Sequence, residues 1–215
     1  MRKSTLTFAA AAGLAALSIG TLHAQGGPSG PPGAQDPSRV TAGSYKTDPG
    51  HSLVGWRVNH FGFSDYFGIF GDVEGTLTLD PANLAGAKVD VTIPIAKVTT
   101  ASAGLTGHLT RAGQNGGKPD FFGPDPAPAR FVSTGVQVNG QSATITGDLT
   151  MNGVTKPVTL DAEFVGAGKH PFNQKETVGF EAETTIKRSE WGLGGFIPMV
   201  GDEVELDITV AFEKQ

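Results

Sequence analysis

The chain contains no cysteine among its 215 residues. Thiol catalysis, disulfide bonds and thiolate metal sites are therefore excluded, and stability must come from a packed core. Basic residues are also scarce, with 16 Lys and Arg against 21 Asp and Glu. Because the chain is acidic and lacks a basic run, we expect it to bind neither nucleic acid nor an anionic membrane surface.

Sequence motifs of catalysis are missing as well. The histidines after residue 24 are scattered, without H-E-x-x-H or His-x-His spacing, at His51, His60, His108 and His170. No G-x-S-x-G nucleophile elbow occurs, although Asp48 and His51 are spaced for a local hydrogen bond. We therefore expect no catalytic residue, no metal site and no cofactor.

The longest apolar run, from Leu6 to about Ile19, is too short to cross a bilayer as a helix of ~20 residues. It follows Arg2 and Lys3 and precedes Leu22-His23-Ala24, a pattern that predicts a secretory signal peptide over residues 1–24 and export to the periplasm. No cysteine follows for lipid attachment, so we expect no stable membrane anchor. Cleavage would leave 14 basic and 21 acidic residues, a formal charge of −7.

Beyond the signal, composition divides the chain in two. Residues 25–43 are rich in Gly, Pro, Ser and Gln and lack apolar periodicity, which predicts a flexible leader. Residues 44–215 are long enough for a single domain with a sizeable core.

Period-two alternation of apolar residues dominates this domain and is typical of half-buried strands. About eight such strands follow one another, at residues 54–58, 73–79, 89–95, 131–138, 145–151, 158–164, 178–186 and 204–212. Only residues 101–112 indicate a helix, with Ser102 as its cap and Leu105 and Leu109 one turn apart. The fold class predicted is all-β: an antiparallel barrel rather than a sandwich, because closure removes exposed edges.

One hairpin is specified locally. Asn152-Gly153 tolerates positive φ at both central positions of a type I′ turn, so it joins two antiparallel strands directly. This turn pairs Met151 with Val154 and sets the register that places the apolar residues of both strands on one face.

Several motifs together identify the chain as similar to one family. They are D-P-G-H-S from Asp48, V-E-G-T-L-T-L-D-P from Val73, G-D-L-T-M-N-G-V-T-K-P-V-T-L-D from Gly147, T-I-K-R-S-E-W-G from Thr185 and V-G-D-E-V from Val200. This series resembles the YceI-like family over almost all of the domain. The resemblance implies a lipocalin-like barrel, usually periplasmic, that holds an isoprenoid or other long-chain amphiphile in an apolar pore. The chain departs from the pattern in a Gly-rich insertion at 112–118.

Four aromatic side chains are expected to crowd the loop after the strand at 54–58, near the rim of the barrel: Phe61, Phe63, Phe67 and Phe70. The resemblance, joined to the alternating strands and to such aromatic clusters, predicts the ligand-binding residues. They are Trp56, Val58, Phe61, Phe131, Leu149, Met151, Phe164, Phe180, Ile186, Trp191 and Phe196. Val58, Leu149 and Phe180 also suit an ordinary packed core, and the rim aromatics suit a plug. An interaction module with a filled barrel and a lipid-modifying enzyme therefore remain alternatives to a lipid carrier.

Three cationic or titratable side chains are candidates for contact with a ligand head group: His108, Arg111 and Arg188. A salt bridge to a nearby carboxylate is the alternative for each arginine. A homodimer through a strand edge or the aromatic rim is left open.

Overall fold

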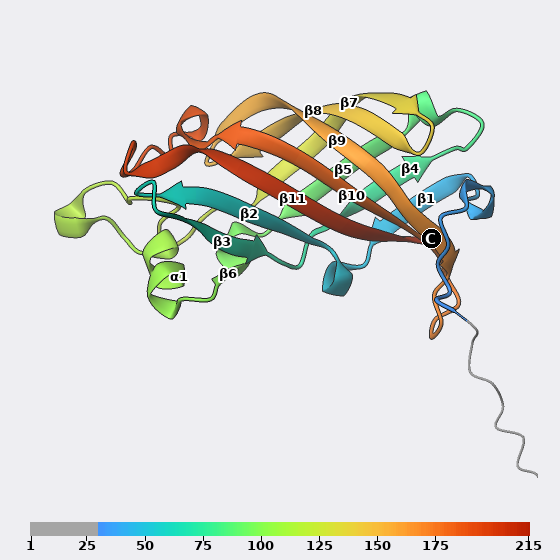
Figure 1. Cartoon of the computed structure of the whole chain (residues 1–215), viewed down its shortest axis with the longest axis horizontal. Helices are drawn as coiled ribbons and strands as arrows, with labels where there is room; N and C mark the ends of the chain where they lie inside the picture. The colour runs from blue at the N-terminus through green and yellow to red at the C-terminus, as the bar shows by residue number, and fades with distance from the viewer. Residues whose placement is uncertain (1–29) are drawn as a thin grey trace, which may run out of the picture. The chain divides into compact units, whose positions relative to one another are not determined.

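A computed structural model describes residues 30–215, and the predicted signal peptide lies outside the described residues (Figure 1). Eleven antiparallel strands form one sheet. The strands are β1 (Gly43–Thr47), β2 (Leu53–His60), β3 (Ser64–Phe70), β4 (Glu74–Leu79), β5 (Lys88–Ile93), β6 (Val98–Thr100), β7 (Ala129–Asn139), β8 (Ser142–Met151), β9 (Val154–Lys169), β10 (Glu176–Lys187) and β11 (Val200–Lys214).

Eight strands close into a ring in the order β1-β4-β5-β7-β8-β9-β10-β11, because β11 also pairs with β1. The predicted barrel is thus confirmed. Strand β11 is long enough to pair with β1 near its end, where Tyr45 faces Lys214, and with β2 over Val204 to Thr209. Strands β2, β3 and β6 therefore extend the sheet beyond the ring.

The segment that follows β2 differs from the prediction. We expected Phe61, Phe63, Phe67 and Phe70 to crowd a loop, but the last two lie on strand β3, which pairs with β2 from Ser64 to Phe70. A tight turn makes this possible, since Phe61 and Gly62 have φ of 57° and 71°.

The predicted hairpin between β8 and β9 is confirmed. Met151 pairs with Val154, and the ladder continues through Gly147 opposite Val158. Asn152 and Gly153 have φ of 50° and 75°, as a type I′ turn requires. A Cβ at Gly147 would lie 2.3 Å from the Phe131 ring, so this glycine leaves room for an aromatic side chain inside the barrel.

The predicted helix is α1 (Ala103–Thr110), whose cap Ser102 accepts a hydrogen bond from the Leu105 backbone at 3.3 Å. Leu109 is buried, and its carbonyl accepts from the Phe122 N–H at 3.0 Å. The helix thereby holds residues 119–122 at one end of the barrel. No helix within residues 30–215 has the length and apolar character needed to span a membrane.

We expected residues 25–43 to be flexible, but the second half of this leader forms hydrogen bonds with the barrel. Ala34 exchanges two backbone hydrogen bonds with Ala167 on β9, at 3.0 and 2.9 Å. Gly168 on β9 allows the leader to approach this closely, because it has no side chain. A Cβ at this position would lie 2.2 Å from the Pro32 carbonyl oxygen. The segment then continues to Thr41, whose backbone N–H donates to Glu176 at 2.7 Å.

Candidate functional site

The interior of the barrel holds a cavity of about 400 Å³. That volume falls within the ~300–1,000 Å³ typical of small-molecule sites. Its wall is apolar and is contributed by β2 to β5 and β7 to β11. Val204, Leu206 and Ile208 point inward yet are only partly buried, since the space beside them is not filled by side chains.

The two ends of the cavity differ. At one end its wall includes Leu84 and Val138, which are 36% and 41% exposed, together with Pro37 and Val40 of the leader. At the other end it includes Leu109, Leu193 and Arg188, which are buried. We call the first the open end and the second the sealed end.

Most of the predicted ligand-binding residues meet in this wall. Seven of the eleven line the cavity: Trp56, Phe131, Leu149, Met151, Phe164, Phe180 and Ile186. Val58 is buried beside the wall, whereas Phe61 and Phe196 are 50% and 41% exposed at the sealed end. The alternation of apolar residues along the strands identified side chains that point into the barrel. A side chain that points inward, such as that of Val58, does not always line the cavity.

Trp191 lies outside the cavity wall and is almost completely buried. Its indole N–H donates to the Leu149 carbonyl oxygen at 3.2 Å, and its own carbonyl accepts from the Asn152 side chain at 2.8 Å. Trp191 therefore ties the turn of the β8–β9 hairpin to the segment before β11.

Trp56 differs from Trp191 in its hydrogen bonding. Its indole packs against β3 at Gly68. This position needs a glycine, because a Cβ there would lie 2.2 Å from the indole ring. Among residues 30–215 the structure shows no acceptor for the Trp56 indole N–H, although this group is buried. A buried donor without a partner is uncommon in a folded protein, which marks the Trp56 indole as a feature of this wall.

In the part of the chain that the structure describes, Arg188 is the one charged side chain that both lines the cavity and is buried. Its guanidinium donates to the carbonyl oxygens of Gly201 (2.8 Å), Val200 (2.9 Å) and Leu193. Within residues 30–215 it forms no salt bridge, so the salt-bridge alternative is wrong for this arginine. Burial lowers the pKa of Arg188, and the charge of Asp202 opposes that effect. Two of its five N–H groups remain for other partners.

His108 and Arg111 are placed differently. Both lie outside the cavity wall and bind the same oxygen of Asp120, at 2.8 Å from His108 Nε2 and 3.0 Å from Arg111 Nη2. The hydrogen bond from His108, and then that from Arg111, lowers the pKa of Asp120. The salt-bridge alternative therefore describes Arg111.

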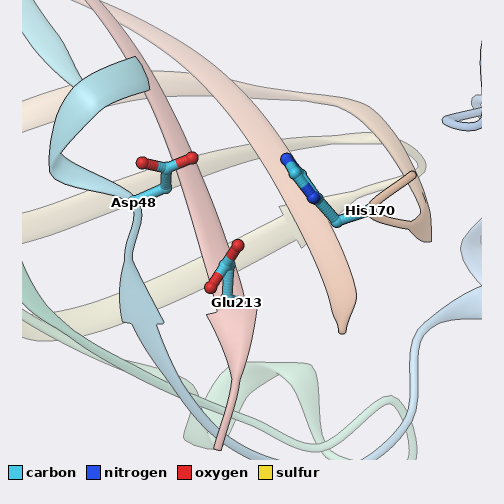
Figure 2. A group of neighbouring side chains, drawn as sticks. All are labelled: Asp48, His170 and Glu213. Atoms are coloured by element: carbon cyan, nitrogen blue, oxygen red, sulfur yellow. The ribbon is translucent and has the colours of Figure 1, made fainter. Parts of the chain in front are cut away.

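A second polar cluster was not foreseen from the sequence. Figure 2 shows Asp48, His170 and Glu213 converging from three separate segments, with one ligand-type atom of each within 4.8 Å of the others. No spacing signal announces this cluster, because its members are far apart in the chain.

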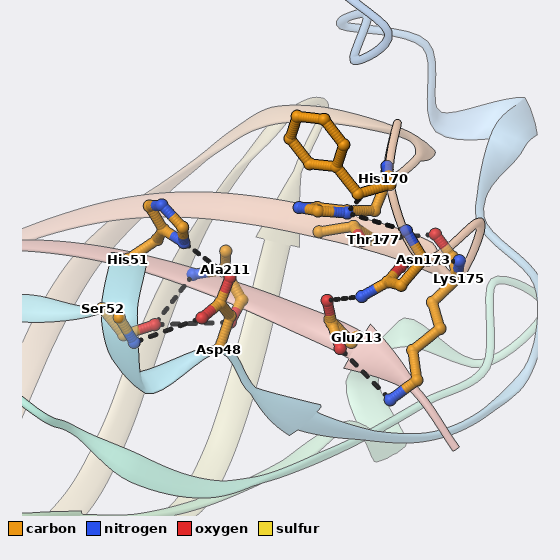
Figure 3. A network of polar contacts seen from close by, with 11 residues as sticks. Asp48, His51, Ser52, His170, Asn173, Lys175, Thr177, Ala211 and Glu213 are labelled. Atoms are coloured by element: carbon orange, nitrogen blue, oxygen red, sulfur yellow. Dashed lines mark hydrogen bonds and ion pairs between the residues drawn. The ribbon is translucent and has the colours of Figure 1, made fainter.

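The polar atoms of this cluster have partners within the protein (Figure 3). Glu213 accepts from Asn173 at 2.6 Å and pairs with Lys175 at 3.2 Å, and these contacts hold its pKa below the usual value. His170 Nδ1 accepts from the backbone N–H groups of Phe172 and Asn173, at 3.4 Å each. Together with the contacts of Glu213, these hydrogen bonds fit a network that fixes the β9–β10 loop.

The expected hydrogen bond between Asp48 and His51 is present at 2.6 Å. The neighbouring Ser52 is buried, with 1% of its surface exposed. Its hydroxyl donates to the Ala211 carbonyl oxygen at 3.3 Å and accepts from the Ala211 N–H at 3.2 Å (Figure 3). A serine held in this way is not presented to a substrate, so the three residues do not form a nucleophilic triad.

Comparisons with known proteins agree with this architecture. A model of the YceI-like domain matches residues 45–212. "Protein YceI" of Shigella flexneri is 41% identical over 179 residues, which cover 82% of this chain and 90% of the relative. Among solved structures, a Campylobacter jejuni YCEI protein has a TM-score of 0.58 and 28% identity, covering 73% of this chain and 90% of that chain. A polyisoprenoid binding domain from Saccharophagus degradans has a TM-score of 0.53 and 12% identity, covering 80% and 98%, and shows the same fold.

Proposed function

Because this chain belongs to the YceI-like family, we propose that it is a periplasmic binding protein that holds one isoprenoid-type or other long-chain lipid in its barrel. The observation that carries the proposal is the apolar cavity of about 400 Å³ that runs along the barrel interior. The fold shared with a polyisoprenoid binding domain supports the class of ligand. The predicted signal peptide supports the location.

The ligand contacts we propose are the seven predicted residues in the cavity wall, with Trp56, Leu149 and Phe180 representing three of its strands. Each methylene transferred from water to such a wall gains ~0.8 kcal/mol, so about ten methylenes gain ~8 kcal/mol before the cost of immobilisation. A long chain therefore binds without any strong polar contact.

The polar end of the ligand has two candidate donors inside the barrel. They are the unpartnered Trp56 indole N–H and the two remaining N–H groups of Arg188. His108 and Arg111 are less suited to a head group, because both lie outside the cavity wall and already bind Asp120. We therefore propose Arg188 as the head-group contact among the three original candidates.

The alternatives receive less support. A filled barrel that acts only as an interaction module would not leave partly buried residues such as Leu206 lining a cavity of about 400 Å³. A lipid-modifying enzyme needs a reactive group beside the ligand. Among residues 30–215, two charged side chains line the cavity: Arg188, which is held by backbone carbonyls, and Glu163, which is exposed. Binding without catalysis is the function we favour.

Native mass spectrometry of protein purified from the periplasm tests the proposal. We expect an adduct with the mass of one long-chain amphiphile, released by organic extraction and identified in the extract. Protein that carries no lipid, and takes up neither a polyprenyl phosphate nor an isoprenoid quinone from detergent, would exclude the carrier function.

A further inference from the structure

Large apolar side chains gather on two adjoining loops at the sealed end of the barrel. We call this cluster the apolar tip; it consists of Phe61, Phe63, Phe196, Ile197 and Met199, which are 50%, 91%, 41%, 38% and 51% exposed. The first two lie in the β2–β3 turn and the others in the loop before β11. The Phe61 N–H donates to the Met199 carbonyl oxygen at 2.7 Å, which holds the two loops together.

The backbone of both loops presents these side chains to solvent. Phe61 and Phe196 have φ of 57° and 63°, a left-handed conformation that aromatic residues rarely adopt. Asn59 supports the first loop, since its side-chain oxygen accepts from the Gly62 N–H at 2.8 Å. The apolar tip is therefore held outward by the fold.

The chemistry of the apolar tip restricts its partner. Residues 61–63 and 192–199 contain no charged side chain. The His108 ring lies beside Phe196, 5.7 Å between centroids, and both His108 and the neighbouring Arg111 are paired with Asp120. An exposed apolar surface without charged residues of its own suits the interfacial region of a lipid bilayer, into which Phe and aliphatic side chains insert. Because the chain as a whole is acidic, electrostatic attraction to anionic lipid is not part of this contact.

The apolar tip is also continuous with the cavity. Phe196 contacts Phe121 at 6.1 Å between ring centroids, and Phe121 lines the cavity. Leu193, from the same loop as Phe196, lines it too. The loop is close to residues 119–122, since a Cβ at Gly195 would lie 2.1 Å from the Asp120 carbonyl oxygen. One aromatic layer thus separates the exposed tip from the interior.

From these observations we propose that the apolar tip is a docking surface for a zwitterionic lipid bilayer, which brings the sealed end of the barrel against the membrane. The inference rests on the proposed lipid-binding function for the identity of the cargo. Docking is reversible, because a few side chains insert at the interface and no segment spans the bilayer.

The chain offers a matched control for this surface. Phe63 and Phe172 are both 91% exposed, but Phe172 lies in the β9–β10 loop, at the opposite end of the barrel near the C-terminus (Figure 1). Replacing either by aspartate should leave the fold intact, since both side chains are largely exposed and the ring contact of Phe172 with His170, at 5.7 Å between centroids, lies at the surface. Unfolding curves of Phe63→Asp and Phe172→Asp check this.

The experiment measures flotation of the full mature chain with phosphatidylcholine vesicles. We expect the wild type and Phe172→Asp to bind, and Phe63→Asp to lose at least about tenfold in partition coefficient, or 1.4 kcal/mol. Lipid uptake from vesicles should slow in Phe63→Asp, whereas uptake from detergent micelles should be unchanged.

Four results would overturn the docking proposal. They are a wild type that does not bind these vesicles, binding that requires anionic lipid, equal losses in both variants, and a dimer in solution that Phe63→Asp dissociates. A wild type that binds vesicles but takes up no lipid from micelles would instead refute the proposed function and leave docking in place.

Discussion

A tryptophan placed inside the barrel should separate a ligand cavity from a packed core. Leu149 on β8 lines the cavity and is 8% exposed. The hollow beside it, about 400 Å³, equals the liquid volume of roughly a dozen water molecules at ~30 Å³ each. An indole ring at this position therefore has space to occupy, and Leu149→Trp should cost less than about 1 kcal/mol of unfolding free energy.

The same substitution should obstruct a ligand. Losing the burial of only two methylenes costs ~1.6 kcal/mol, which is more than a tenfold loss of affinity. We therefore expect Leu149→Trp to reduce lipid uptake at least about tenfold while the protein stays folded. Native mass spectrometry gives the loaded fraction, and urea denaturation gives the stability.

Val178 provides the matched control. It is completely buried on β10, paired with Phe212 and Ala167, and lies outside the cavity wall. Overpacking there should cost ~1–3 kcal/mol or more. If Leu149→Trp is destabilised as strongly as Val178→Trp, the interior behaves as a filled core and the cavity argument is refuted.

Three further predictions address the turn, one buried phenol and the leader. Gly153→Val should destabilise the fold by ~1–3 kcal/mol in urea, because a β-branched residue is strained at φ 75°; unchanged stability would contradict the type I′ turn. Burial, and then the hydrogen bond to Glu176, raises the pKa of Tyr45 to about 12 from 10.0, so its contribution to stability is complete below pH 10 and lost as pH rises through 12. Tyr45→Phe should remove that alkaline loss in pH-dependent unfolding, and a profile identical to the wild type would show that the phenol is not responsible. Gly168→Val should displace the leader from β9, since a Cβ there meets Pro32; faster limited proteolysis near residues 30–40 is expected, and equal rates would contradict the docking of this segment.

The features that sequence alone determined are local ones. The Asn152-Gly153 turn needs positive φ at two consecutive residues, and this requirement decides the register of β8 and β9 without help from the rest of the chain. Ser102 and the spacing of Leu105 and Leu109 likewise specify α1. Alternation identified which side of each strand faces inward, because the side-chain period of a strand is two.

Tertiary structure decided what depends on pairs distant in the chain. The barrel closes where Tyr45 to Thr47 of β1 pair with Phe212 to Lys214 of β11. No local sequence pattern predicts that these two stretches pair with each other. The fold also decides that Trp56 lines the cavity whereas Trp191 is buried outside its wall, a difference that residue type alone does not give. The hydrogen-bond partners of Arg188 could not be predicted from the sequence either. They are backbone carbonyl groups, which every residue has, so only the fold determines which of them lie within reach of the guanidinium.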